Sequence, residues 1–377
     1  LVSSSAASDV YKRQALYLGL QLLTLILSPG MAHATHGQTD HRHFSQIETE
    51  EAYNTGWEFY FDNDVFLGST KDRNYTGGLA LTLAGRRAAE YPFSLDPWLG
   101  GFERLSGYHQ LNEKPGLFRR HAIEFGLTLF TPDNITSKAP IYDDHPYANL
   151  LFIANSRISV DLERGRMYQS NLLLGLLGSS VGEQVQKQIH RLTDSEIPQG
   201  WDNQISDGGE LTFKHSLSLH QLLISHQSGL SYDLRGGLEA GLGHTTDLRA
   251  SLTGRWGKLG SDWWSFTPHQ NEYINLGQTL SGNALQESNT PEFYLWGGVQ
   301  LKYRFYNALL QGQFRHSEVS FNRDQLKPLI LSAWLGITKT FANGLGLSFV
   351  VQAQTSEIDL PDRRNAVWGG LVVSRIY

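Results

Sequence analysis

The sequence contains no cysteine, so neither disulfides nor thiolate metal sites contribute to this protein. The absence suits an oxidising compartment, where an unpaired thiol is a liability. A formal net charge of -6 excludes the basic surplus of a nucleic-acid-binding protein. No stretch reaches the ~20 consecutive apolar residues of a transmembrane helix. A mean hydropathy of -0.32 would suggest a soluble protein, but the strands of a membrane barrel average to the same value. Composition therefore leaves both classes open.

Glycine and aromatic residues are plentiful. The chain has 38 Gly, 16 Tyr and 9 Trp, which together with the missing cysteines fits a β architecture with aromatic residues at a membrane interface.

The N-terminal region has the order of a secretory signal. Residues 1–14 lack an initiator Met and are interpreted as a non-native segment. Lys12-Arg13 precedes the apolar run Ala15–Leu27, and small residues ending at Ala34 predict a cleavage site there, so 15–34 is the expected signal peptide. The mature chain therefore leaves the cytoplasm, with a polar leader at 35–52.

Alternating apolar and polar residues predict β-strands through the remainder, residues 53–377. The twelve predicted strands are Gly56–Phe66, Tyr75–Gly85, Arg119–Phe130, Asn149–Asp161, Met167–Leu177, Gly209–Ser225, Gly229–Gly241, Thr246–Trp256, Phe293–Tyr306, Leu329–Phe341, Leu345–Ser356 and Ala366–Ile376. Only closure leaves no unpaired strand edge in lipid, and an even number of strands allows it. The predicted fold is an all-β, twelve-stranded antiparallel outer-membrane β-barrel, although alternation alone would also fit a soluble β-sandwich.

Connection lengths support this topology in part. Tight turns follow the fourth, sixth and tenth strands, as expected on the periplasmic side. The outward loops are then Leu67–Asn74, Thr131–Ala148, Gly178–Gly208, Leu242–Thr245, Asn307–Pro328 and Glu357–Asn365. Two inward connections, Arg86–Phe118 and Gly257–Glu292, are too long for that rule. We interpret them as periplasmic elaborations.

The third outward loop contains a predicted helix. Ser180 and Glu183 have the spacing of a capping box. An apolar stripe at helical intervals follows: Val181, Val185, Ile189 and Leu192. His190 lies off this stripe, and because Gln186 is four residues before it, both side chains would face one small volume. A surface helix with an incidental histidine would give the same pattern.

The first hairpin carries a second polar cluster. Trp57, Phe59 and Phe61 alternate with Glu58, Tyr60, Asp62 and Asp64, which predicts aromatics toward lipid and polar side chains toward the lumen. Hard oxygen donors at Asp62–Asp64 and in Lys71–Gly78 could hold Ca²⁺. Ordinary solvated turn residues would look alike. A third cluster, in Phe130–Ile135 and Asp143–Ala148, falls at the same outer end of the barrel.

Taken in order, these motifs resemble the lipid A 3'-O-deacylase family of Gram-negative outer membranes, over nearly the whole mature chain. The motifs are Asn63-Asp64-x-Phe66, Asp72-Arg73-x-Tyr75-Thr76-x-Gly78, Thr131-Pro132-Asp133, Pro146-Tyr147-Ala148, Gly182-Glu183-x-Val185-Gln186 with His190, and Pro198-x-Gly200-Trp201-Asp202-x-Gln204. The resemblance implies a twelve-stranded barrel whose Ca²⁺-dependent site faces the outer leaflet and removes the 3'-linked acyloxyacyl group of lipid A.

The resemblance also assigns roles. His190 matches the family's essential histidine, and Asn63 and Asp64 match its essential pair, which we expect to hold the Ca²⁺. Gln186 and Glu196 match supporting positions, and Thr76 is matched to a site hydroxyl. The chain departs from the family in one motif, since His145 and Asn149 stand where the family has Arg and Gly. The lost arginine would alter contact with a lipid A phosphate, which leaves the exact substrate open.

Ester hydrolysis needs a base and a group that stabilises the oxyanion. We expect His190 to take a proton from water, with the carboxylate of Glu196 or Asp64 orienting it, and Ca²⁺ to polarise the carbonyl. No Gly-x-Ser-x-Gly elbow is present, and Ser179 and Ser180 are better explained as helix caps.

The expected partners are lipid A and the outer membrane, without nucleic acid, and the expected state is a monomer. Four basic residues are candidates for lipid A phosphates, although each could serve solubility alone: Lys71, Arg73, Lys138 and Lys187. Two other functions stay open. One is a phospholipase-type outer-membrane acyl hydrolase, and the other is a non-catalytic barrel that binds lipid or forms a pore.

Overall fold

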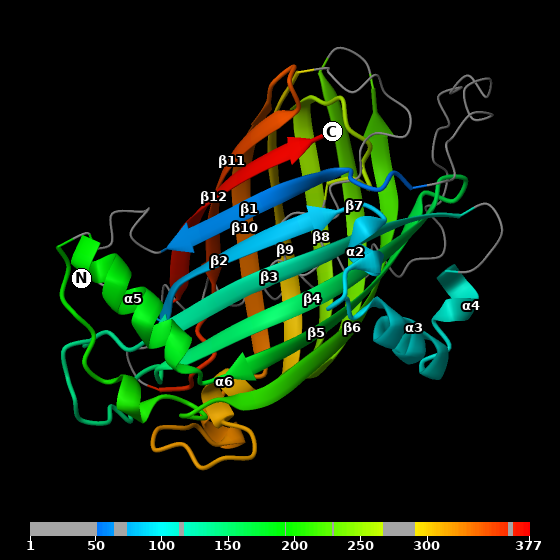
Figure 1. Ribbon diagram of the computed structural model, residues 1–377. Helices are drawn as coiled ribbons and strands as arrows, with labels where there is room; N and C mark the ends of the chain where they lie inside the picture. The colour runs from blue at the N-terminus through cyan, green and yellow to red at the C-terminus, as the bar shows by residue number, and fades with distance from the viewer. Residues whose placement is uncertain are drawn as a thin grey trace, which may run out of the picture.

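The strands close into one barrel (Figure 1). The computed structural model describes residues 51–63, 74–112, 117–192, 194–227, 230–266, 291–360 and 365–377. The strands are β1 Gly56–Asn63, β2 Asn74–Ala84, β3 Phe118–Thr131, β4 Ala148–Asp161, β5 Arg166–Leu177, β6 Glu210–His226, β7 Ser231–Gly243, β8 Thr245–Lys258, β9 Glu292–Asn307, β10 Leu329–Thr340, β11 Leu345–Gln354 and β12 Ala366–Ile376. The prediction of twelve strands is confirmed, with described ends within three residues of those expected.

Closure is made by the first and last strands. Antiparallel pairing of β1 with β12 runs from Gly56 opposite Ile376 to Asn63 opposite Gly369. Each other strand pairs with its neighbours in sequence, so the backbone hydrogen bonds are satisfied between strands and the barrel has no open edge. In the described part of the chain, no helix has both the length and the apolar character needed to cross a bilayer.

Side chains alternate between the lumen and the outer surface. In β1, Glu58, Tyr60 and Asp62 are buried, whereas Phe59 between them is 40% exposed. The same holds in β6, where Lys214 and Ser216 are buried and Phe213 is exposed. The predicted inward orientation of Glu58, Tyr60 and Asp62 is confirmed, whereas Asp64 lies outside the described residues.

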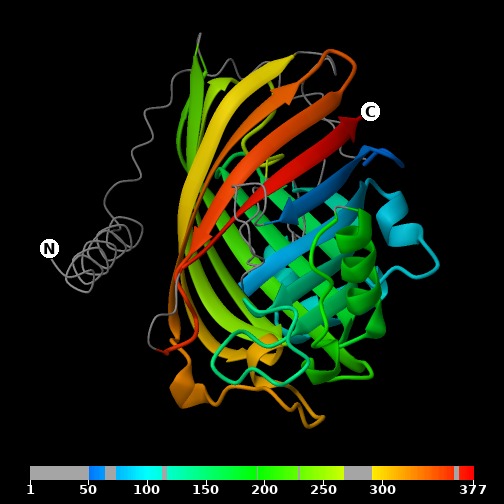
Figure 2. The ribbon, with the colours of Figure 1, turned by 90° about the vertical axis from the view of Figure 1, so that its left-hand side faces the viewer.

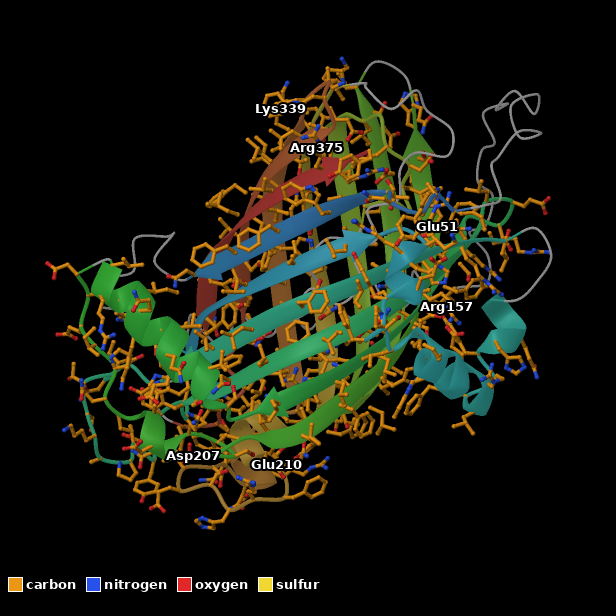
Figure 3. All side chains as sticks on the ribbon, in the orientation of Figure 1. Glu51, Arg157, Asp207, Glu210, Lys339 and Arg375 are labelled. Atoms are coloured by element: carbon orange, nitrogen blue, oxygen red, sulfur yellow. The ribbon has the colours of Figure 1, made fainter. Side chains whose placement is uncertain are left out.

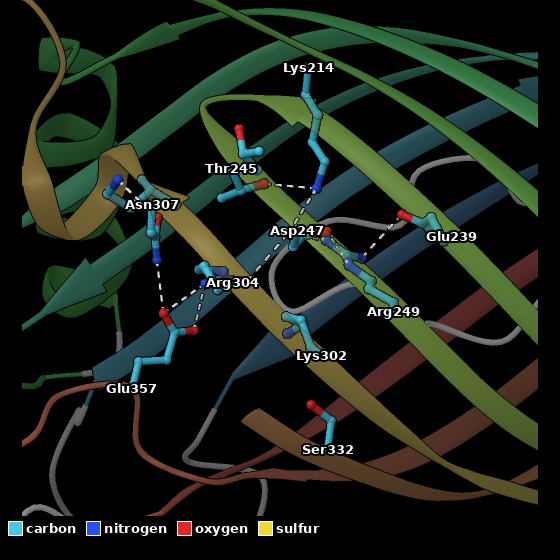
Figure 4. Close-up of polar contacts among 12 residues, drawn as sticks. Lys214, Glu239, Thr245, Asp247, Arg249, Lys302, Arg304, Asn307, Ser332 and Glu357 are labelled. Atoms are coloured by element: carbon cyan, nitrogen blue, oxygen red, sulfur yellow. Dashed lines mark hydrogen bonds and ion pairs between the residues drawn. The ribbon is translucent and has the colours of Figure 1, made fainter. Parts of the chain in front are cut away.

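Ion pairs fill the extracellular half of the lumen (Figure 4). Asp247 on β8 accepts a hydrogen bond from Arg249 Nε at 2.7 Å and lies 3.6 Å from Lys214 Nζ and 3.8 Å from an Arg304 guanidinium nitrogen. Arg304 also donates to the carboxylate of Glu357, at 2.6 Å. These contacts connect three strands with the segment after β11, so polar side chains occupy this part of the interior.

The connection after β8 enters the other end of the lumen. Trp264 is 1% exposed and packs against Phe118 with its ring centroid 4.8 Å away. Met167 and Val160 belong to the same cluster. We interpreted Gly257–Glu292 as a periplasmic elaboration, but its first residues also fill the barrel interior. Residues 267–290 lie outside the described part.

The connection after β2 folds against the outside of the barrel (Figures 1 and 2). It forms the short helices α2 Arg87–Glu90, α3 Asp96–Leu105 and α4 His109–Asn112. They contact β3, β4 and β5. We expected Arg86–Phe118 to be a periplasmic elaboration. Residues 86–112 instead pack against the outer wall of the barrel, where outward-pointing polar side chains of β4 hold them.

The remaining helices of the described residues lie in extracellular connections. They are α5 Ser180–Leu192, α6 Ala308–Gln311 and two 3₁₀ turns, Trp201–Asn203 and Arg323–Gln325. The helix predicted from the capping box is thus confirmed as α5. The expected non-native segment and signal peptide lie outside the described residues, as does the leader except for residues 51 and 52.

Replacing Arg304 by Met should destabilise the barrel, because Glu357 and Asp247 would lose a buried cationic partner. Removing one member of a buried ion pair typically costs about 3–5 kcal/mol. Urea unfolding followed by tryptophan fluorescence in micelles would measure the loss. The matched control is Lys258→Met at the exposed end of β8. Equal midpoints for the two variants would contradict the structural role of the network.

Candidate active site

Helix α5 lies along the outer surface of the wall, beside the extracellular ends of β3 and β4 (Figure 2). Its most buried residues are Gly182, Gln186 and His190, which share one face at intervals of four. The predicted apolar stripe flanks this face and is only partly buried, and Leu192 at its end is 77% exposed. The helix therefore turns Gln186 and His190 toward the barrel, and the neighbouring Val181 and Val185 pack against an apolar cluster of Leu127, Leu129, Tyr147 and Trp201.

Close packing at Gly182 lets the helix approach the wall. A Cβ atom at this position would lie 2.6 Å from Cγ of Asn149, which points outward from β4. Asn149 is fully buried, and its amide donates to the carbonyl of Ser179 and to Oε1 of Gln204. Ser179 Oγ in turn donates to Asn149 Oδ1. The departure at Asn149 thus connects β4 to Ser179, just before α5, through two hydrogen bonds and to Gln204 through a third.

The wall opposite α5 is shaped by a β-bulge in β2. The register shifts between Tyr75 and Gly77, so Thr76 is the extra residue. Its hydroxyl lies 2.6 Å from that of Thr131 on β3. Gly77 has φ of 156°, and a Cβ there would meet the Asp62 carbonyl at 2.6 Å and Asn63 Nδ2 at 3.2 Å. Only glycine lets the Asn63 side chain occupy this place.

The wall and the helix enclose a small pocket, here named the wall–helix pocket. It is lined by Phe61, Asn63, Thr76, Leu79, Leu127, Leu129, Val185, Gln186, Ile189 and His190, among others. Four residues singled out in the sequence, Asn63, Thr76, Gln186 and His190, therefore meet at one place. The apolar residues Leu127 and Leu129 were missed by sequence reasoning, although their alternation in β3 places them on the outer face.

The end of α5 fixes the orientation of the His190 ring. The helix ends with Asp194 in the left-handed region, φ 54°, and the N–H of Ser195 donates to the His190 carbonyl, as in a Schellman motif. This turn brings the main-chain carbonyl of Glu196 to 2.5 Å from His190 Nδ1. Because a carbonyl only accepts, Nδ1 carries the proton, and in the neutral ring Nε2 holds the lone pair.

Glu196 therefore contributes in a different way from the one expected. Its carboxylate is exposed, and its main-chain carbonyl contacts the imidazole. A sequence motif cannot distinguish these two modes, because the backbone carbonyl is present whatever the residue type.

Gln186 is held by Trp201, which in turn packs on Tyr147. Its Oε1 accepts a hydrogen bond of 2.9 Å from Trp201 Nε1. Trp201 packs against Tyr147 with ring centroids 4.9 Å apart, and the Tyr147 hydroxyl donates to the carbonyl of Ile135. The motifs around Tyr147 and Trp201 thus form the support of α5 and pack in one cluster with Leu127 and Leu129 of the pocket lining.

His145, the second departure, lies in another cavity. Its ring stacks on Phe130 at 4.9 Å, and its Nδ1 lies 2.8 Å from the Pro146 carbonyl. It lines a cavity in the barrel mouth together with Tyr75 and Glu357. Among the described residues that line the wall–helix pocket, His145 is not included.

The other candidates are less central. Lys187 forms an ion pair with Glu183 at 2.5 Å on the partly exposed side of α5. Lys138 has an exposed side chain, and its carbonyl accepts from Asn203. The remaining predicted site residues lie outside the described part of the chain: Asp64, Lys71 and Arg73.

Comparisons with known proteins agree with this architecture. The model of a family described as outer membrane protein LpxR matches residues 20–377. A search of curated proteins finds no match. Among solved structures, LpxR from Salmonella typhimurium is similar with a TM-score of 0.64 and 14% identity, covering 86% of this chain and all 100% of that one. The β domain of the Bordetella autotransporter BrkA has a TM-score of 0.41 and 9% identity, over 86% and 99% of the two chains. The Salmonella structure supports the barrel fold.

Replacing Gly182 by Ala should loosen α5, because the added Cβ would overlap Asn149, which three hydrogen bonds fix. Overpacking of this kind costs about 1–3 kcal/mol, so opening of the helix should rise by about fivefold to about a hundredfold. Tryptic cleavage at Lys187 and Arg191 would report it.

Gly101→Ala in α3 is the matched control, since a Cβ there meets nothing within 4 Å. Equal cleavage rates in the two alanine variants would show that α5 does not depend on close approach to β4.

Proposed function

Because this chain belongs to the LpxR outer membrane protein family, we propose that it is a lipid A deacylase that hydrolyses the 3'-linked acyloxyacyl ester. The family membership confirms the resemblance of its motifs and places the protein in the outer membrane. The observation that carries the proposal is an imidazole of fixed tautomer, in a pocket between a helix and the outer wall of the barrel.

The surroundings of the pocket suit a substrate whose acyl chains stay in lipid. Phe61 pairs with Leu79 across β1 and β2, and both line the pocket. The next outward pair, Phe59 and Leu81, is 40% and 38% exposed. Apolar surface is therefore continuous from the pocket to the lipid-facing wall, so an ester could reach His190 while its chain remains against the barrel.

His190 would act as the general base. Nε2 takes a proton from a water molecule, whose oxygen bonds to the ester carbonyl carbon. When the tetrahedral intermediate breaks its bond to the sugar oxygen, the imidazolium returns the proton to that oxygen. The amide of Asn63 and the hydroxyl of Thr76 lie in the same pocket and would donate hydrogen bonds to the developing oxyanion. Gln186, held by Trp201, would keep α5 and its histidine in place.

Ca²⁺ is part of the proposal. The described residues include no cluster of three or more His, Cys, Asp or Glu side chains suited to a metal. A site here would combine the amide oxygen of Asn63 with the carboxylate of Asp64 and main-chain carbonyls, and such hard oxygens are the donors that Ca²⁺ prefers. When bound, the ion would polarise the ester carbonyl.

Lys138 and Lys187, with Lys71 and Arg73, would contact lipid A phosphates at the extracellular end. All the residues proposed for the reaction belong to one chain, so we propose that the protein acts as a monomer.

Replacing His190 by Ala should lower deacylation about 10²–10⁴-fold, the usual contribution of a general base. Mass spectrometry of lipid A from a Gram-negative host expressing each variant would measure the product. His316→Ala, on an exposed loop, serves as the control. Phospholipids are analysed in the same samples. Loss of acyl groups from phospholipid alone would replace lipid A by a phospholipase substrate, and full activity without His190 would exclude the proposed base.

Chelation of Ca²⁺ should stop deacylation by the wild type, and added Ca²⁺ should restore it. Asn63→Ala should require a higher Ca²⁺ concentration for half-maximal rate, because one oxygen donor is lost. Asn343→Ala is the control, because this residue lies in the exposed turn between β10 and β11 and does not line the wall–helix pocket. It should leave the Ca²⁺ titration unchanged. A rate that is insensitive to chelator in the wild type would rule out a metal at this site.

A further inference from the structure

The wall beneath the connection between β2 and β3 has outward side chains that are unusual for a surface facing lipid. Asn155 and Arg157 on β4 occupy outward positions, alternating with the inward Ala154, Ser156 and Ile158. Unpaired polar groups in an apolar medium are costly, and a charge more so. Protein must therefore cover these side chains, and the segment 86–112 does so.

Hydrogen bonds fix this segment to the wall. Asn155 Nδ2 donates to the Ala88 carbonyl at 3.0 Å, and its Oδ1 accepts from the N–H of Leu95 at 2.8 Å. Arg157 bonds to Asp96 at 2.8 Å and to Glu103 at 2.5 Å, both on α3. Figure 3 labels Arg157 at the side of the barrel where α3 lies. The two acidic side chains of α3 are thus paired with Arg157 on the barrel wall.

Aromatic contacts place the same segment on the apolar outer surface. Phe93 packs edge-on against Phe125 of β3, with ring centroids 5.6 Å apart. Phe102 of α3 lies 6.4 Å from Phe213 of β6, and Phe213 and its outward neighbour Leu211 are 42% and 70% exposed. Helix α3 therefore borders the exposed apolar side chains of the barrel wall.

The face of α3 that turns away from Arg157 is apolar and uncovered. Trp98 is 70% exposed and Leu105 is 87% exposed. They lie four residues before and three residues after Phe102, so the three share one side of the helix. Leu99 and Glu103 are buried against the barrel instead. In water such a stripe would be a liability, whereas in a bilayer it continues the lipid-facing wall.

We propose that α3 is an in-plane membrane helix, whose stripe of Trp98, Phe102 and Leu105 contacts the acyl chains of the bilayer around the barrel. The acidic residues of α3 neutralise Arg157. Because α3 covers this part of the wall, its apolar residues contact lipid in place of the wall. The proposal rests on the outer-membrane location and not on the deacylase reaction.

The absence of cysteine makes a direct test possible, since each introduced thiol is unique. Trp98→Cys and Leu105→Cys would be labelled with bimane after refolding of the full chain into phosphatidylcholine vesicles. Leu211→Cys is the lipid-facing reference, and Asn343→Cys, in an exposed turn, is the aqueous reference. Arg104→Cys is the matched control, because it is exposed on α3 but lies off the stripe. Only variants that keep the heat-modifiable gel mobility of a folded barrel are compared.

Nitroxide-labelled lipids should quench the probes at 98 and 105 within about twofold of the probe at 211, and iodide should quench them at least about fivefold less than the probe at 343. The probe at 104 should be quenched more strongly by iodide than the probe at 105. If the probes at 98 and 105 match the aqueous reference in lipid vesicles, α3 does not lie in the bilayer and the proposal fails. Equal iodide quenching at 104 and 105 would also overturn it, because the stripe would then have no orientation.

Discussion

A polar side chain that points outward from a lipid-facing barrel needs protein over it that can form hydrogen bonds. This constraint explains both external elements of the structure. Asn155 and Arg157 are covered by the segment 86–112, and Asn149 is covered by the start of α5. In each case the covering element provides hydrogen-bonding groups toward the wall. The chemistry of the proposed site becomes possible because α5 shields one polar patch on an otherwise apolar surface.

Polar side chains inside the lumen also need hydrogen-bonding partners. Strand alternation sends polar side chains inward, where they are enclosed and must satisfy one another. The network around Asp247 and Arg304 does this near the extracellular end, and Trp264 with Phe118 fills space near the other. A packed interior holds the strands at fixed positions. Because the strands are fixed, Thr76 in the bulge and Asn63 at the end of β1 are also held in place, as a site on the outer face requires.

The histidine at the end of α5 shows how backbone geometry prepares a side chain. A left-handed residue, Asp194, reverses the chain so that the carbonyl of Glu196 meets Nδ1 of His190. The tautomer follows from this contact, and with it the ring nitrogen available to accept a proton. Trp201, which packs on Tyr147, holds the helix through its hydrogen bond to Gln186. The two departures from the family motif belong to the support of this region and to the barrel mouth, so neither changes the lining of the wall–helix pocket.

The sequence by itself predicted the barrel, because an even number of strands with a period of two, together with the expected signal peptide, favours a membrane barrel over a soluble β-sandwich. It also determined that α5 exists and that Gln186 and His190 share a face, since both depend on local spacing. Only the tertiary structure decided that Asn63 and Thr76 lie across a pocket from His190, because strand register and a bulge bring them together. It also decided that the main-chain carbonyl of Glu196 contacts His190 and that the segment 86–112 returns to the outer wall. Those outcomes depend on contacts between residues far apart in the chain, and no local pattern encodes them.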